Sequence, residues 1–585
     1  MHARKVWAAI ALLVALTMGA SACSGGGDPG QGAQSQAPSA TANDANPLPR
    51  EQLADSGTLR WPIAGLPPNF NYHQIDGMYG PTRDVVFALL PLAFEADAMA
   101  TPRLNTELLE FAQVTATSPK QVVTYRINPQ AVWSDGAPIT WRDFEAQWRA
   151  LNGTDPAYLI AQSNGYNQVE SVVRGADERE AIVTFSSPYS DWEGMYRPLY
   201  PASTTSDPAV FNTGWMDGPL ASAGPFRFGS VDRTAQTITL VRDERWWGQP
   251  AKLDQIIFRV IDSDALGDAL ANDEIDWMDV GPNVSSYQRV QGIPGIDIRT
   301  AGGPNFRHIT MNGTSEFLRD VTVRRALSLA IDRQAIAQAL IGPLGVPAEA
   351  LGNHIFMRNQ AGYQDNGVPY DPDQARALLE EAGWRLDGDV RSRDGQEFAL
   401  RLVIPSGVVQ ARQEAELTQG MLADVGVRVS IEAVPSDQFF PVYVNIGDFD
   451  LTIFTWLGDP YPVGSQRSIY LNPRVGPDGQ PIVEQNYARV GSPEIDLLFT
   501  RANAELDPGL ATQLLNQVDT LIWEAGHSVT MYQRPDIFAG KATLANFGAK
   551  GFADWIYEDI GYARPGEAGA ERPTVGGDQG GGDQS

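Results

Sequence analysis

The second half of the chain contains helices that end at a glycine and lead directly into a strand. The segment Gln413–Val425 has helical spacing, Gly426 follows it, and apolar residues then alternate with polar ones over 427–431. The first half carries strand patterns instead, because apolar and polar residues alternate over 122–127 and 256–261. A helix, a capping glycine and a strand in this order are typical of α/β folds. The sequence therefore predicts an α/β protein.

One further helix follows Asp320 and another begins at Asp371, and two more have an N-cap residue followed by proline, at Ser492-Pro493 and Asp507-Pro508. No period of about 20 to 50 residues repeats, which excludes solenoids and propellers. Between two polar ends lie roughly 515 residues, enough for more than one hydrophobic core at about 100 to 200 residues per domain.

The N-terminus has the order of an export signal. Arg4 and Lys5 precede an uncharged run over 6–18, and small residues lead from there to Cys23. Because a membrane-spanning helix needs about 20 apolar residues, the run is typical of a cleaved signal peptide, 1–22, with an uncleaved anchor as the alternative. We therefore expect the mature chain to lie outside the cytoplasmic membrane.

Cys23 is the only cysteine of the chain, which excludes internal disulfides and thiolate metal clusters. The segment before it resembles a bacterial lipoprotein signal, in which the cysteine after the cleavage point receives the lipid, although Ala20 stands where that family usually has leucine. The resemblance implies lipidation of Cys23 and an anchor on the outer face of the cytoplasmic membrane. An ordinary signal peptide with an incidental thiol is the alternative.

Both ends of the mature chain are polar and rich in small residues, which predicts a flexible tether over 23–47 and a disordered tail over 564–585. The chain holds 71 acidic and 43 basic residues, a formal net charge of −28. Such a surface repels nucleic acid and anionic lipid headgroups, so we expect no nucleic-acid partner.

The sequence contains no recognisable catalytic or metal-binding constellation. Its five histidines form no H-E-x-x-H pair: His2, His73, His308, His354 and His527. A G-x-S-x-G nucleophile elbow does not occur either. We therefore predict no catalytic residue, no metal and no cofactor. A pair of carboxylates acting as acid and base stays open, because the acidic residues are so numerous.

Three collinear stretches resemble the peptide- and nickel-binding family of ABC solute-binding proteins. They are VTYRINPQAVWSDGAPITWRDF at 123–144, the region 222–276 with SAGPFRF and LVRDERWWGQPAKLDQIIFRVI, and VRRALSLAIDR at 323–333. Judged by the order and spacing of these motifs, the resemblance covers about residues 58 to 562. It is strongest with the oligopeptide-binding lipoproteins of high-GC Gram-positive bacteria.

The family resemblance implies a two-lobed periplasmic-binding-protein-like fold with an extra domain and with lobes joined by crossing strands. By resemblance, domain I takes 48–75, 197–300 and 530–563, domain II takes 76–196, and domain III takes 301–529. Closure around a ligand would let the ABC permease subunits recognise the closed form. The resemblance thus implies a monomeric binding protein that hands its ligand to a membrane permease.

A peptide-binding site needs a carboxylate for the ammonium group and free backbone for the peptide chain. The segment 456–459 resembles the family segment in which an aspartate pairs with the ammonium group, which implies this role for Asp459. Family position also suggests two backbone edges for strand addition, at 69–71 and at 456–458. The expected ligand-binding residues are Asp459, Trp456, Gly458, Asn69, Phe70, Asn71, Phe306 and His308. No partner for the peptide carboxylate is identified, and Arg467 only lies near the motif.

The predicted function is capture of oligopeptides for an ABC importer. One alternative keeps the fold and changes the ligand to a nickel chelate, haem, an oligosaccharide or a modified peptide. Another is a lipoprotein that regulates envelope biosynthesis through protein contacts. Asp459 separates these hypotheses in part, because a descendant without transport need not keep a partner for an ammonium group.

Overall fold

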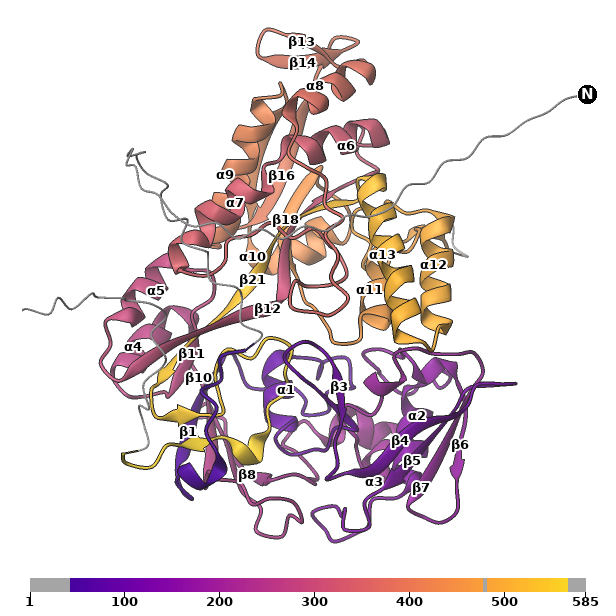
Figure 1. The fold of residues 1–585 in the computed structure, drawn as a ribbon, viewed down its shortest axis with the longest axis vertical. Coiled ribbons are helices and arrows are strands. Elements are labelled where there is room, and N and C mark those ends of the chain that lie inside the picture. Colours follow the sequence, from indigo (N-terminus) through magenta and orange to yellow (C-terminus); the bar gives the residue numbers. More distant parts are fainter. Residues whose placement is uncertain (1–42, 477–480, 567–585) are drawn as a thin grey trace, which may run out of the picture. The chain divides into compact units, whose positions relative to one another are not determined.

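The computed structural model describes residues 43–476 and 481–566, which belong to one unit, Ser39–Ser585 (Figure 1). The predicted signal peptide 1–22, Cys23, most of the tether 23–47 and most of the tail 564–585 lie outside the described residues. None of the helices in the described part combines the length and apolar character that a bilayer crossing requires.

A six-stranded sheet has the strand order β11-β21-β12-β18-β16-β17. Its strands are β11 (Trp277–Asp279), β12 (Ile296–Met311), β16 (Ala399–Pro405), β17 (Arg428–Val434), β18 (Leu451–Trp456) and β21 (Ser528–Lys541). The two longest strands, β12 and β21, are antiparallel, and their register shifts between Gly302 and Phe306. Strand β16 is parallel to both β17 and β18. A mixed sheet of this kind, combined with helices, is the predicted α/β arrangement.

The first half of the chain forms two four-stranded sheets with the orders β1-β10-β9-β8 and β4-β5-β7-β6. Their strands are β1 (Thr58–Ile63), β4 (Leu109–Ala116), β5 (Val122–Ile127), β6 (Val169–Arg174), β7 (Glu180–Phe185), β8 (Phe226–Asp232), β9 (Thr237–Arg242) and β10 (Gln255–Val260). Short strands are β2 (Phe94–Ala96), β3 (Pro102–Leu104), β13 (Arg385–Asp387), β14 (Val390–Arg393), β15 (Gln396–Glu397), β19 (Arg474–Val475), β20 (Pro481–Ile482), β22 (Leu544–Ala545) and β23 (Gly561–Tyr562).

The α-helices are α1 (Gly80–Val86), α2 (Trp141–Leu151), α3 (Ala202–Thr205), α4 (Leu266–Ala271), α5 (Val284–Gln291), α6 (Val321–Ala330), α7 (Arg333–Leu340), α8 (Pro372–Glu381), α9 (Val409–Ala423), α10 (Ser436–Gln438), α11 (Pro462–Tyr470), α12 (Pro493–Ala504) and α13 (Pro508–Ala525). Helices α12 and α13 lie side by side, and α11 contacts α12 (Figure 1).

The long strands connect two hydrophobic cores. Ala301 of β12 and Phe538 of β21 pack in a core with the two four-stranded sheets. Ile309 and Val529, farther along the same strands, pack in a second core with α6, α7 and α9. Two cores bridged by crossing strands are the arrangement that the sequence predicted, while the exact domain boundaries stay a prediction.

The four predicted helix starts are confirmed. The side chains of Asp320, Asp371, Ser492 and Asp507 accept hydrogen bonds from the first turns of α6, α8, α12 and α13, respectively. The helix expected over 413–425 begins earlier, at Val409, and is followed by Gly426 with a φ of 83°. This left-handed conformation is the one that favours glycine behind a helix.

The two ends of the described chain are bound to distant segments. The backbone N–H of Asp44 donates to the Ala549 carbonyl (2.8 Å), and the N–H of Leu48 donates to Oδ1 of Asn546 (2.9 Å). The N–H of Arg564 donates to the Gln52 carbonyl (2.9 Å). The last residues of the tether predicted over 23–47 and the first residue of the tail predicted from 564 thus make hydrogen bonds to the folded chain, and both boundaries stay predictions.

Candidate functional site

Strand β18 has an open edge in its C-terminal half. It pairs with β12 along its whole length, so that Trp456 lies opposite Phe306. With β16, however, it pairs only at Leu451 and Thr452. Beyond Thr452, none of the described strands covers that edge. The open edge spans the end of β18 up to Trp456, and strand addition at 456–458 stays a prediction.

The turn after β18 is packed tightly against the irregular part of β12. The N–H of Gly458 donates to Oδ1 of Asn305 (3.2 Å). A β-carbon at Gly458 would lie only 1.9 Å from the carbonyl oxygen of Pro304, so no larger residue fits without a backbone shift. Glycine at this position therefore allows the close contact with β12 and sets the backbone position of the next residue, Asp459.

Asp459 carries a carboxylate that lacks an ionic partner. Its Oδ1 accepts a hydrogen bond from the N–H of Tyr461 (2.7 Å), and no Lys, Arg or His of the described residues lies within ion-pair distance of it. The side chain keeps contact with solvent, yet desolvation by the surrounding protein raises its pKa. The Tyr461 amide, Arg197 and Arg83 oppose this rise. The Asp459 carboxylate can therefore bind a cationic group of a ligand.

A cluster of charges from distant segments faces this turn. The carboxylate of Asp554 is buried and binds Arg197 (2.8 Å) and, more loosely, Arg83 of α1 (3.5 Å). The Arg197 guanidinium also lies over the ring of Tyr461, 5.3 Å from its centroid. Burial would raise the pKa of Asp554, but the two arginines hold it below its usual range. The two arginines also lower the pKa of Asp459, but they pair with Asp554 and form no ion pair with Asp459.

Trp456 is half-buried in an aromatic group. Its ring is stacked on Tyr487 (centroids 5.7 Å apart) and on His308 (5.7 Å), and Phe454 meets it edge-on. Phe306 and His308 are buried, and Nε2 of His308 bonds to Oγ1 of Thr310 (2.9 Å). Burial is the main cause that holds the pKa of His308 well below its usual range, so this ring is neutral at pH 7. Phe306 and His308 therefore form the support behind Trp456.

Residues 69–71 offer no open edge in this structure. All three are buried, the N–H of Phe70 donates to the Trp215 carbonyl (3.0 Å), and the hydroxyl of Tyr200 donates to the Phe70 carbonyl (3.0 Å). The side chains of Asn69 and Asn71 donate to the carbonyls of the segment 211–212. The strand-addition role that we expected for 69–71 has no free backbone here, and a ligand contact of these residues stays a prediction.

Sequence analysis missed Arg83, Arg197 and Asp554. No local signal marks them, because their pairing depends on three segments that lie far apart in the chain. Arg467, which lies near the motif, instead lines a cavity of about 230 Å³ together with Asn164 and Gly464.

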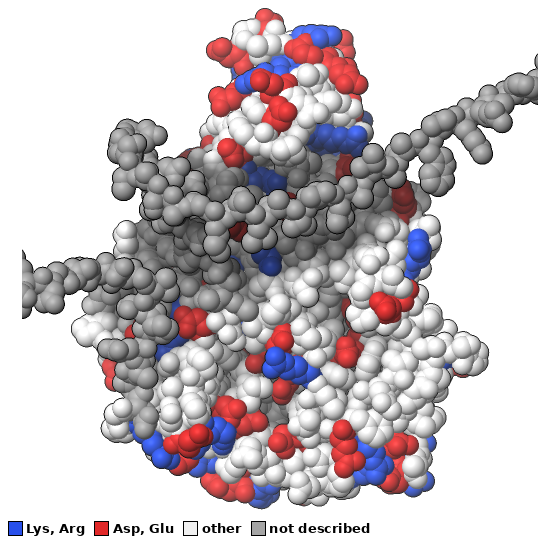
Figure 2. Space-filling model, in the orientation of Figure 1, with Lys and Arg blue, Asp and Glu red and all other residues white. Residues whose placement is uncertain are grey.

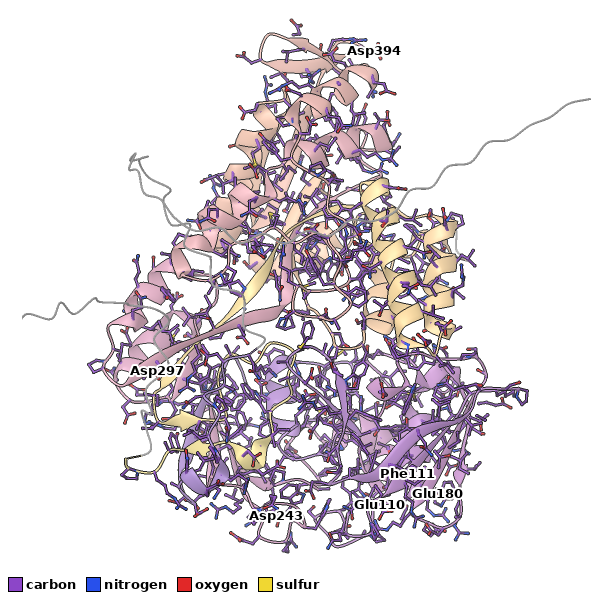
Figure 3. All side chains as sticks on the ribbon, in the orientation of Figure 1. Glu110, Phe111, Glu180, Asp243, Asp297 and Asp394 are labelled. Atoms are coloured by element: carbon purple, nitrogen blue, oxygen red, sulfur yellow. The ribbon has the colours of Figure 1, made fainter. Side chains whose placement is uncertain are left out.

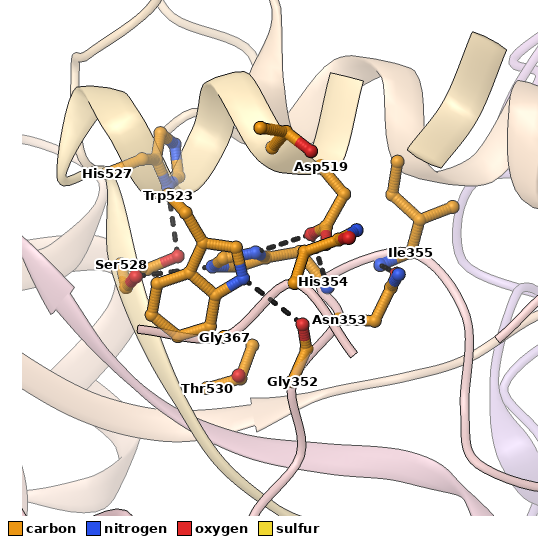
Figure 4. A network of polar contacts seen from close by, with 12 residues as sticks. Gly352, Asn353, His354, Ile355, Gly367, Asp519, Trp523, His527, Ser528 and Thr530 are labelled. Carbon is orange, nitrogen blue, oxygen red and sulfur yellow. Dashed lines mark hydrogen bonds and ion pairs between the residues drawn. The ribbon is translucent and has the colours of Figure 1, made fainter. Parts of the chain in front are cut away.

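A buried histidine–aspartate pair lies in the second half of the chain (Figure 4). Nδ1 of His354 is 2.7 Å from Oδ1 of Asp519, and its Nε2 is 3.2 Å from the carbonyl oxygen of Ser528. Both ring nitrogens thus face acceptors, and the Ser528 hydroxyl contacts His527 instead. The pair lacks the nucleophile that a hydrolytic triad requires. Among the described residues, no three His, Cys, Asp or Glu side chains are grouped to hold a metal.

Acidic and basic side chains are interspersed on the visible face of the molecule, with no large area of one sign (Figure 2). Of the acidic residues labelled in Figure 3, Glu110 of β4 and Glu180 of β7 lie close together in one sheet, whereas Asp243, Asp297 and Asp394 lie in other parts of the molecule. The negative net charge is therefore spread out, which favours solubility more than it defines a binding surface.

Residues 108–476 match the bacterial extracellular solute-binding proteins, family 5, in the part described as the middle of that family. The chain belongs to this family. It is 43% identical over 530 residues to the oligopeptide-binding protein OppA of Mycobacterium tuberculosis, which covers 90% of this chain and 88% of OppA. A probable monoacyl phosphatidylinositol tetramannoside-binding protein of that organism, LpqW, is 26% identical over 432 residues, 67% of this chain and 66% of LpqW.

Solved structures of family 5 proteins share the fold. The periplasmic EDTA-binding protein EppA superposes with a TM-score of 0.80 at 28% identity, covering 89% of this chain and 98% of EppA. The oligopeptide-binding protein AppA of Bacillus subtilis, in complex with a nonapeptide, has a TM-score of 0.70 at 20% identity, covering 88% and 100%. The predicted two-lobed α/β fold and the predicted family are thereby confirmed. The family consists of extracellular solute-binding proteins rather than enzymes.

Proposed function

We propose that this family 5 protein captures oligopeptides outside the cytoplasmic membrane and delivers them to the permease of an ABC importer. The observation that carries the proposal is the carboxylate of Asp459, which has no ionic partner among the described residues and follows directly after the open edge of β18. A free peptide supplies both missing partners, an ammonium group and an extended backbone. The identity with OppA over 90% of the chain supports the same ligand class.

Each site residue has a defined role in this proposal. Asp459 binds the ammonium group, and the backbone at 456–458 pairs with the peptide chain. Trp456 contacts the first ligand side chain, with Phe306 and His308 behind it. Residues 69–71 hold the opposite wall through their buried hydrogen bonds. The protein acts as a monomer, without catalysis, metal or cofactor.

A non-peptide ligand is the second candidate, because two relatives are named for other ligands: EppA for EDTA and LpqW for a phosphatidylinositol mannoside. A lipoprotein that regulates envelope biosynthesis through protein contacts also belongs to this second candidate.

Native mass spectrometry of the purified mature protein tests the ligand class. We expect the bound species to form a ladder of masses separated by amino-acid residue masses, and tandem fragmentation to give peptide sequence ions. A single bound mass without peptide fragments would contradict the proposal and favour the second candidate. Protein denatured, washed and refolded without ligand provides the control, and its spectrum should show the bare chain.

Cys23 would anchor the protein beside the permease. We expect cells supplied with a radiolabelled fatty acid to label the wild-type chain and not Cys23→Ala. The variant should then appear in the culture medium, since the proposed acyl anchor is what holds the mature chain at the membrane. Equal labelling of both chains would contradict lipidation at Cys23 and leave export as the remaining conclusion.

A further inference from the structure

The segment that follows β7, in the lobe that contains the β4-β5-β7-β6 sheet, contacts helices α11 and α12 of the other lobe. The N–H of Ser190 donates to the carbonyl of Asn503 in α12 (2.8 Å), and Nδ2 of Asn503 donates to Oε1 of Gln168 (2.9 Å). Next to these contacts, Oδ2 of Asp191 accepts a hydrogen bond from the N–H of Gly464 in α11 (2.8 Å). At these three contacts the lobes meet near helix ends through hydrogen bonds, and none of the three is an ion pair.

Helix α11 has no capping side chain of its own. Its N-cap residue is Tyr461, which offers no capping hydrogen bond, and its first turn contains no acidic residue. The first N–H groups of a helix need acceptors and favour negative charge. Asp191 supplies both from the opposite lobe, and its side chain is only 8% exposed.

The approach of Asp191 depends on a glycine in the first turn of α11. A β-carbon at Gly464 would lie 3.1 Å from the Tyr189 hydroxyl and 3.6 Å from Oδ2 of Asp191. A β-carbon at this position would require the Tyr189 hydroxyl to shift slightly and would contact the Asp191 carboxylate. Glycine thus leaves room for the close approach of Asp191.

The same helix end carries the proposed ligand carboxylate. Asp459 binds the N–H of Tyr461, and Asp191 binds the N–H of Gly464, so that carboxylates from the two lobes share one helix N-terminus. We propose that Asp191 caps α11 only when the lobes are closed and thereby holds the Asp459 turn in its ligand-binding position. Asp191 is then a positioning residue that prolongs ligand residence without touching the ligand. This inference rests on the proposed function.

The charges around the cap couple it to a cationic ligand group. Burial raises the pKa of Asp191 to about 7, the Gly464 N–H lowers it, and the neighbouring charges of Asp459 and Glu193 raise it again. The pKa of Glu193 is likewise raised to about 7 by burial. An ammonium group bound at Asp459 would relieve this repulsion, so the cap and the ligand stabilise each other.

The experiment measures the release of tetra-alanine from refolded, ligand-free protein by stopped-flow tryptophan fluorescence. For Asp191→Ala we expect about a fivefold faster dissociation, the equivalent of the roughly 1 kcal/mol that a helix cap contributes. The association rate should change little, because interface changes act mainly on dissociation. Asp191→Asn keeps an acceptor oxygen and should restore slow release.

Two controls separate a positioning role from a general structural one. The thermal midpoint of ligand-free Asp191→Ala should equal that of the wild type, because the cap is absent when the lobes are open. Asp155→Ala removes an exposed acceptor that bonds only within its own loop, to the Ala157 N–H (2.9 Å), and should release ligand at the wild-type rate.

The outcomes distinguish this inference from the proposed function. If tetra-alanine does not bind the wild type, the proposed function fails. If it binds, and Asp191→Ala releases it at the wild-type rate or lowers the ligand-free thermal midpoint, the inference is overturned while the proposed function stands. Release from Asp191→Asn as fast as from Asp191→Ala would also overturn it, since asparagine keeps the acceptor oxygen that the cap uses.

Discussion

Replacing Asp459 with alanine should weaken the binding of tetra-alanine by at least about 30-fold. The reason is that the substitution leaves the ligand's ammonium group enclosed without a counter-charge. Truncating one partner of such a pair costs about 2 kcal/mol or more, and each 1.4 kcal/mol corresponds to a factor of ten in affinity. The fold should persist, because the only described side-chain hydrogen bond of Asp459 is to an N–H two residues away. Isothermal titration calorimetry measures the change.

The ligand itself provides the matched control. N-acetyl-tetra-alanine lacks the ammonium group and should bind the wild type as weakly as Asp459→Ala binds free tetra-alanine. In Asp459→Ala, acetylation should make almost no further difference, since the two changes remove the same interaction. An unchanged affinity of Asp459→Ala for the free peptide would contradict the assignment.

Local patterns of the sequence predicted local structure well. Asp320, Asp371, Ser492 and Asp507 each cap a helix because the cap and its N–H partner are at most three residues apart. The contacts at the end of the predicted tether show the opposite case. Asn46 and Leu48 are bound by a segment almost 500 residues away, and no composition rule reports such a partner.

The binding site likewise has one part that the sequence indicated and another part that only the tertiary fold reveals. The segment 456–459 is contiguous and could be identified by resemblance, and its open edge and unpaired carboxylate agree with that identification. Arg83, Arg197, Asp554 and Asp191 come from separate segments that only the tertiary fold brings to it. Residues 69–71 are the opposite case, because only the structure reveals that Trp215 and Tyr200 bind the Phe70 backbone, and a ligand contact of these residues stays a prediction.

We expect the largest loss of stability when a buried ion pair behind the binding site is broken. Arg307 of β12 binds Glu414 of α9, with Nε 2.9 Å from Oε1, and the two side chains are 6% and 0% exposed. The Tyr532 hydroxyl donates to the same carboxylate, and Arg307 also donates to Oγ1 of Thr455 (3.0 Å), the neighbour of Trp456. The pair therefore fixes β12, β18, β21 and α9 to one another.

Glu414→Ala should lower the free energy of unfolding by about 3 to 5 kcal/mol, because Arg307 would remain buried without a counter-charge. Urea unfolding of the mature chain, followed by tryptophan fluorescence, measures the loss. Glu432→Ala is the matched control, since Glu432 pairs with Arg401 at 2.9 Å but both side chains are 42% exposed, and such pairs contribute about 0 to 1 kcal/mol. The double variant Arg307→Met/Glu414→Leu should regain most of the lost stability, because it removes both charges and refills the space. Equal losses in Glu414→Ala and Glu432→Ala would contradict this account, since Arg307 is buried and loses its carboxylate partner, whereas Arg401 is partly exposed and keeps Asp448 at 2.7 Å.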